Sequence, residues 1–141
     1  MIAASVLAVA LAATQPTDPE PPAPPAAPSA PVTVEMNAVQ LLALATARAE
    51  AGDTATAEAM FAALAKDPDI DIRSEARFRH GRMLEAQKRY NAAAVLYRAI
   101  LDEQPGAQRV RLQLARALLF AGNEGGAARV LRQAQAGGLP A

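Results

Sequence analysis

Charge is the feature of this sequence that points most clearly to chemistry. Twelve of its 14 basic residues are arginine, whose planar guanidinium suits carboxylates and phosphates. Residues 38–72 hold two basic and six acidic side chains, a net charge of −4, whereas residues 73–141 hold twelve basic and five acidic ones, a net charge of +7. We therefore expect the second part of the chain to offer a basic surface. Pairing within the chain, for example of Arg82 with Glu85, explains these charges equally well.

No constellation for catalysis or metal binding is found in the sequence. Residues 67–71 carry carboxylates at alternate positions, as a calcium loop does. However, Ile72 stands where such a loop needs glycine, and Phe78 stands where it needs the bidentate glutamate. His80 is the only histidine and cysteine is absent, so His80 is expected to be a packing or helix-surface residue. We predict a protein that is not an enzyme and has no metal or cofactor.

The elements that position the arginines are expected to be helices. Aromatic residues make up only 4% of an alanine-rich chain, a composition that favours an all-α fold. Comparison of the chain with itself at an offset of 34 to 36 residues aligns small side chains with small ones and large with large. The key positions are Ala57, Ala93 and Ala127, followed by Phe61, Tyr97 and Leu131. These repeats predict three helix hairpins, over residues 38–73, 74–107 and 108–141.

Each repeat has a turn signal near its middle. The signals are Gly52-Asp53 in the first repeat, Arg89-Tyr90-Asn91 in the second and Gly122-Asn123 in the third. Glycine can adopt the left-handed conformation that ends a helix. Asp or Asn can accept hydrogen bonds from the free N–H groups of the next helix.

Two further segments precede the repeats. Residues 1–13 include an apolar run that is too short to span a bilayer, for which about 20 residues are needed. The run contains an A-x-A cleavage pattern, although no basic residue precedes it. It predicts a signal peptide and a periplasmic location, and a cytoplasmic location if the segment is not cleaved. Residues 14–37 contain eight of the eleven prolines and are expected to be a disordered, extended linker.

The repeat pattern resembles the tetratricopeptide repeat. In that family a 34-residue unit carries small residues at positions 8 and 20, an aromatic at position 24 and a proline near its end. The second repeat matches through Gly81, Tyr90, Ala93, Tyr97 and Pro105. The resemblance implies a right-handed α-solenoid that binds partners along the first helices of its hairpins.

In that family, partner-binding residues stand at positions 2, 5, 9 and 12 of each first helix. Carried over to this chain, they are Val39, Leu42, Thr46, Ala49, Glu75, Phe78, Arg82, Glu85, Arg109, Leu112, Arg116 and Leu119. Their mixture of apolar and basic side chains suggests an extended peptide with apolar and acidic residues. Nucleic acid is not expected, because the chain is neutral overall and has few aromatics for stacking.

A narrower resemblance covers residues 75–140, which are similar to the N-terminal domain of surface lipoprotein assembly modifiers. It rests on the order RVRLQLARALLF followed by GLP. It implies a periplasmic accessory role beside an outer-membrane barrel, with AQAGGLPA as the junction to that barrel. The alternatives are a stand-alone repeat scaffold or a chaperone-type adaptor. An apolar stripe on the last helix predicts self-association through that helix. Its residues are Ala127, Val130, Leu131 and Ala134.

Overall fold

The computed structural model describes Pro22 and residues 36–137 of the 141-residue chain. The predicted signal peptide, nearly all of the predicted linker and the GLP sequence lie outside the described residues. The described chain forms six helices: α1 (Ala38–Glu50), α2 (Thr54–Leu64), α3 (Ile70–Ala86), α4 (Tyr90–Glu103), α5 (Gln108–Phe120) and α6 (Glu124–Ala136). It contains no strand within these residues.

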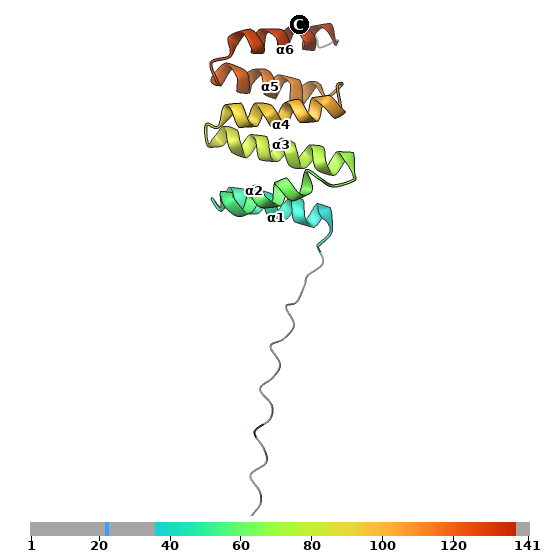
Figure 1. Ribbon diagram of the computed structural model, residues 1–141, viewed down its shortest axis with the longest axis vertical. Helices are drawn as coiled ribbons and strands as arrows, with labels where there is room; N and C mark the ends of the chain where they lie inside the picture. The colour runs from blue at the N-terminus through green and yellow to red at the C-terminus, as the bar shows by residue number, and fades with distance from the viewer. Residues whose placement is uncertain (1–21, 23–35, 138–141) are drawn as a thin grey trace, which may run out of the picture. The chain divides into compact units, whose positions relative to one another are not determined.

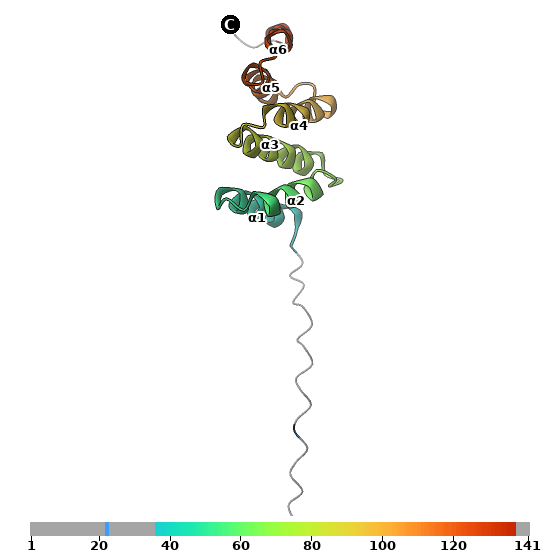
Figure 2. The ribbon, with the colours of Figure 1, turned by 60° about the vertical axis from the view of Figure 1, so that its left-hand side comes forward.

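The helices pair in chain order as three hairpins, α1–α2, α3–α4 and α5–α6, which stack one upon the next (Figures 1 and 2). This arrangement confirms the predicted all-α solenoid of helix hairpins. The first helices of the hairpins, α1, α3 and α5, contribute the positions expected to bind a partner. Within residues 36–137, no helix combines the length and the apolar character needed to cross a membrane.

Two of the three turns follow the sequence prediction. Gly52 and Gly122 adopt the left-handed conformation, with φ of 84° and 79°. The Asp53 side chain accepts a hydrogen bond from the Thr56 N–H, and the Asn123 side chain accepts one from the Gly126 N–H. These side chains cap α2 and α6 and satisfy N–H groups that have no partner within the helix.

The turn of the second hairpin differs from the prediction. Lys88, which is not a glycine, takes the left-handed conformation there, with φ of 61°. Asn91 does not cap α4, because it lies inside that helix. The cap position is Arg89, whose side chain makes no capping hydrogen bond. This turn is therefore held by backbone bonds from the Lys88 and Arg89 N–H groups to the ends of α3.

The second hairpin also begins earlier than residue 74, where the repeat alignment places it. The Asp69 side chain accepts a hydrogen bond from the Asp71 N–H at 2.8 Å, so α3 starts at Ile70. Asp67 accepts one from the Asp69 N–H at 2.9 Å. The alternating carboxylates that resembled a calcium loop thus start a helix.

The hydrophobic core consists of two clusters that share α3. One joins the α1–α2 hairpin to Ala76 and Met83 of α3. The other joins Phe78 and Leu84 of α3 to α4, α5 and α6. The predicted small positions Ala57, Ala93 and Ala127 are all fully buried, which lets paired helices approach closely. Because α3 contributes to both clusters, it positions the first hairpin relative to the other two.

The apolar stripe predicted on α6 is mostly covered by its own hairpin. Ala127 and Ala134 are buried, Val130 is partly buried, and Leu131 is 38% exposed. In contrast, Phe61 and Tyr97, at the positions equivalent to Leu131, are buried, because a further hairpin follows each of them. The uncovered apolar surface of the stripe is small, which weakens the case for self-association through this helix.

Candidate functional site

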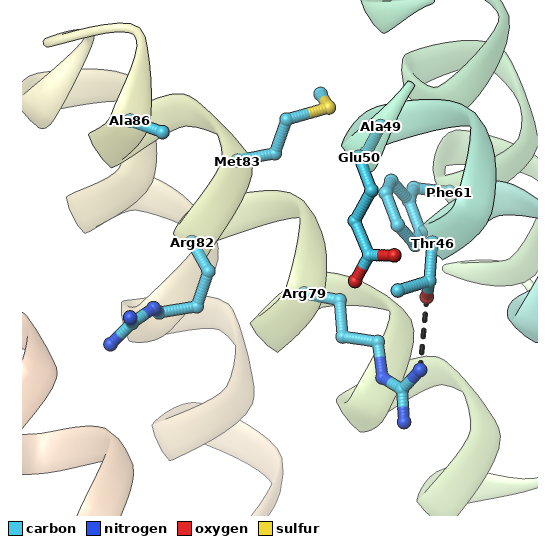
Figure 3. Close-up of a pocket in the computed structure, with 8 residues that line it drawn as sticks. All are labelled: Thr46, Ala49, Glu50, Phe61, Arg79, Arg82, Met83 and Ala86. Atoms are coloured by element: carbon cyan, nitrogen blue, oxygen red, sulfur yellow. Dashed lines mark hydrogen bonds between the residues drawn. The ribbon is translucent and has the colours of Figure 1, made fainter. Parts of the chain in front are cut away.

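A hollow of about 340 Å³ lies between the first hairpin and α3 (Figure 3). Met83 of α3 and Phe61 of α2 give it an apolar lining, together with Ala49 at the end of α1 and Ala86 at the end of α3. The remaining lining residues are Thr46, Glu50, Arg79 and Arg82. The hollow is open to solvent and is large enough for one bulky side chain of a partner.

Two of the four polar side chains at this hollow, those of Thr46 and Arg79, bind each other. Arg79 donates a hydrogen bond to Thr46 Oγ1 at 2.9 Å (Figure 3). Its Nε donates another to Glu75 Oε1 at 2.7 Å. Two predicted binding residues, Thr46 and Glu75, therefore fix Arg79 between α1 and α3. What the hollow offers a partner is mainly its apolar surface.

A second hollow, of about 210 Å³, lies between α3 and α5. Arg82 and Ala86 line both hollows, so the two are neighbours. The stacked rings of Tyr90 and Phe120, with centroids 5.2 Å apart, line this second hollow. The guanidinium of Arg116 lies 5.7 Å from the centre of the Phe120 ring, an attractive cation–π distance.

The outward face of α5 continues this surface. Arg109, Leu112, Arg116 and Leu119 follow one another at intervals of three or four residues and are all exposed. Leu112 is 44% exposed and Leu119 is 51% exposed. We refer to the two hollows together with Arg109, Leu112 and Leu119 as the groove.

The predicted binding residues differ in burial, and Thr46, Ala49 and Glu75 are partly buried. Arg82, Arg109 and Arg116 are exposed, as expected, and so is Val39. Leu42, Phe78 and Glu85 are buried and cannot bind a partner through much of their surface. The guanidinium of Arg109 covers the Phe78 ring at 4.6 Å. Equivalent positions differ because α5 covers the face of α3, whereas within residues 36–137 no further hairpin covers α5.

Glu85 performs a structural task beneath the second hollow. Its Oε2 accepts a hydrogen bond from the Tyr97 hydroxyl at 3.1 Å, and Arg82 Nε lies 3.8 Å away. The pKa of Tyr97 is raised chiefly by burial of its hydroxyl and secondly by the negative charge of Glu85. The phenol therefore remains a hydrogen-bond donor, and the predicted pairing of Arg82 with Glu85 is present.

Several other arginines are used within the fold. Arg73 and Arg77 of α3 both bind Glu103 of α4, at 2.7 and 2.9 Å, and these bonds hold the pKa of Glu103 below its usual value. Arg89 binds Glu58 of α2 at 2.8 Å. In contrast, among the described residues no carboxylate lies within 4.0 Å of Arg109 or Arg116. These two arginines keep their charge available to a partner.

His80 is a packing residue at the junction of the first two hairpins. Its ring stacks on Phe61, with centroids 5.7 Å apart, and its Nε2 lies 3.5 Å from Glu58 Oε1. Burial lowers the pKa of His80, and the neighbouring Glu58 opposes that effect. Over Pro22 and residues 36–137, no cluster of acidic, histidine or cysteine side chains could hold a metal ion.

The carried-over positions did not include several residues that line the hollows. Arg79, Met83 and Ala86 occupy α3 positions 6, 10 and 13, counted from Ser74, and Phe120 occupies position 13 of its repeat. Helical spacing offers a signal for Arg79, Ala86 and Phe120, because each lies four residues after a position that was considered. It offers none for Met83, which directly follows Arg82. Tyr90 lies at the start of α4, where the sequence suggested a turn and a match to the repeat pattern but no contact with a partner.

Part of this helical stack matches a known protein family. Residues 84–137 match the protein-family model described as a tetratricopeptide repeat. The match runs from the end of α3 through α6 and so includes α5 of the groove. No curated protein and no solved structure matches the chain, so the resemblance to lipoprotein assembly modifiers remains a prediction. The match supports tetratricopeptide repeats over residues 84–137, and the six helices together form an all-α helical-repeat solenoid.

Proposed function

We propose that this chain is a protein-interaction module that binds an extended segment of a partner protein in the groove. Tetratricopeptide repeats generally bind proteins or peptides and are typically non-catalytic scaffolds. The observation that supports this proposal most directly is that two neighbouring hollows share Arg82 and Ala86, and that Arg116 and Phe120 of α5 line the second. A partner segment that crosses α3 would contact both.

The chemistry of the groove favours a segment with both apolar and acidic residues. Leu112 and Leu119 alternate with Arg109 and Arg116 along α5, and all four are exposed. Burial of the leucines by a partner contributes about 25 cal/mol per Å² of apolar area removed from water. The arginines attract acidic groups and fix the register of the bound segment.

The proposal can be tested with peptides selected from a displayed library of random 12-residue sequences on the full-length chain. The triple variant Arg82→Ala, Arg109→Ala, Arg116→Ala should bind the selected peptides roughly tenfold more weakly or worse, and with less dependence on salt. Fluorescence polarisation at two salt concentrations measures both effects. Because the three side chains are exposed, circular dichroism should show an unchanged fold.

A matched control removes three arginines elsewhere. Arg98 of α4 and Arg129 and Arg132 of α6 are also exposed, and their replacement by alanine changes the net charge by the same amount. This control should keep nearly the affinity of the unaltered chain. Equal losses of affinity in the two triple variants would show that net charge alone explains the effect. Unchanged binding in the groove variant would contradict the proposal.

For the cellular setting, we infer a periplasmic accessory role beside a system that assembles lipoproteins at the outer membrane. The support is the apolar N-terminal run and the sequence resemblance of residues 75–140. Fractionation followed by N-terminal sequencing tests the inference, which expects a mature chain that begins near Ala13 or Thr14. Intact Met1 in the cytosol would favour a stand-alone scaffold or a chaperone-type adaptor instead.

A further inference from the structure

The two hollows of the groove differ in what they offer a ligand. In the first, Phe61 and Met83 contribute to a mainly apolar lining although both are largely buried, and the guanidinium of Arg79 is held by Thr46 and Glu75. Figure 3 shows Met83 and Phe61 bordering the same opening, whereas Arg82 points away from it, on the other side of the helix. An apolar side chain that enters beside Met83 would lie next to the exposed carboxylate of Glu50, which also lines this hollow.

The second hollow offers positive charge. Arg82 and Arg116 both line it, and Phe120 gives Arg116 an aromatic surface at 5.7 Å. The one carboxylate among its lining residues, that of Glu85, is turned into the core. Its Oε2 accepts the Tyr97 hydrogen bond, and its Oε1 is shielded from solvent. A carboxylate of a ligand placed here would meet two guanidinium groups.

The width of α3 sets the distance between these hollows, since one lies on each side of that helix. Packed helices stand about 8–10 Å apart. An extended chain advances about 3.3 Å per residue. The two sites are therefore about three residues apart along an extended ligand.

We propose that the groove recognises a pair of side chains: a large apolar residue (Leu, Met or Phe) and an Asp or Glu about three residues away. The apolar side chain occupies the hollow beside Met83, and the carboxylate lies between Arg82 and Arg116. This proposal rests on the proposed function and gives its partner a chemical signature. It commits to a side-chain carboxylate within an extended protein segment.

Peptides selected from the random 12-residue library provide the test. Alignment of the enriched peptides should show a large apolar residue paired with an acidic one at a spacing of three. In the peptide itself, replacing the apolar residue by Ala should weaken binding roughly tenfold to a hundredfold. Replacing its acidic residue by Gln should weaken binding about tenfold and reduce the salt dependence.

Variants of the protein assign each half of the pair to its hollow. Ala49 lines the first hollow but not the second and is partly exposed, so Ala49→Gln places a polar side chain at the first hollow, and circular dichroism checks that the variant folds. This variant should bind the peptide about tenfold more weakly and become insensitive to loss of the apolar residue. The double variant Arg82→Gln, Arg116→Gln should become insensitive to loss of the acidic residue. Arg98→Gln, on α4, is the control and should preserve both sensitivities.

The outcomes separate this inference from the proposed function. Enriched peptides that lack the pair at this spacing would overturn the inference, and so would undiminished sensitivity to the apolar residue in Ala49→Gln. The proposed function would stand in both cases if binding still required Arg82, Arg109 and Arg116. The absence of any peptide that binds in an arginine-dependent manner would contradict both.

Discussion

The hydroxyl of Tyr97 donates a hydrogen bond to Oε2 of Glu85, at 3.1 Å, inside the α3–α4 hairpin. The same ring lies against Gly81, which is one helical turn before Glu85 on α3. A Cβ atom added at Gly81 would come within 2.7 Å of the ring. Tyr97 is completely buried. This contact therefore joins α3, which lines the groove, to α4. The free energy of unfolding should depend on it.

Truncation of this ring should be among the costliest single changes. Tyr97→Ala should lower the free energy of unfolding by about 3–5 kcal/mol, because it leaves a large cavity. Tyr97→Phe keeps the ring but leaves the buried Glu85 carboxylate without its donor, at a cost of about 1–3 kcal/mol. Urea unfolding of both variants measures these values. A neutral Tyr97→Phe variant would show that the hydrogen bond contributes nothing to stability.

Two glycines of helices should respond in opposite directions to the same substitution. Gly81→Ala should destabilise the fold by about 1–3 kcal/mol, because the buried Tyr97 ring cannot move away from the new methyl group. Gly125 in α6 has no neighbour within 4 Å of an added Cβ, so Gly125→Ala should stabilise the fold by about 0.4–1 kcal/mol. Thermal unfolding distinguishes the two, and equal shifts would contradict the close contact at Gly81.

The turn at Lys88 offers a stabilising change. The left-handed conformation costs an ordinary residue about 1–2 kcal/mol, and Lys88 adopts it with φ of 61°. Lys88→Gly should therefore raise the free energy of unfolding by about 0.5–1 kcal/mol. The reciprocal control is Gly52→Ala, at φ of 84°, which should lower it by about 1 kcal/mol. A loss of stability in Lys88→Gly would refute strain at this turn.

Acid should weaken the junction between the first two hairpins. Burial lowers the pKa of His80 from 6.5, and Arg89 lowers it further, while Glu58 opposes both. The folded chain therefore binds fewer protons than the unfolded chain as the pH falls below about 6.5, and the free energy of unfolding should decrease between pH 7.5 and 5.5. Glu58, whose pKa is lowered chiefly by Arg89, stays ionised over this range.

His80→Gln isolates this effect, because the chain contains one histidine. The variant should show a flatter dependence of stability on pH over the same interval, whatever its stability at pH 7.5. Urea unfolding at several pH values provides the comparison. Identical slopes for the two chains would mean that His80 does not govern the acid response.

The parts of the fold that recur in every repeat could be predicted from the sequence. Ala57, Ala93 and Ala127 occupy equivalent contacts, and Gly52 and Gly122 end their helices as expected. The second turn could not be predicted in the same way, because Lys88 adopts the left-handed backbone conformation that usually requires glycine. There, backbone bonds to the end of α3 replace the usual glycine and cap.

The candidate site was only partly predictable, because burial depends on the neighbouring repeat. Phe78 and Leu112 hold equivalent positions, yet Phe78 lies beneath Arg109 and Leu112 is exposed. The exposure of Arg82 and Arg116 agrees with the expectation that the tetratricopeptide resemblance implied. The role of Arg79 did not, since it depends on Thr46 from a different hairpin.

Partners are expected to bind across α1, α3 and α5. Amide chemical shifts measured during a peptide titration can show directly whether they do. A library-selected peptide is added to the ¹⁵N-labelled full-length chain. The largest chemical-shift changes are expected at Thr46, Arg82 and Arg116, with little change at Val95 and Arg98 on α4. Changes concentrated on α4 and α6, around the separate hollow lined by Arg98 and Arg129, would contradict this expectation.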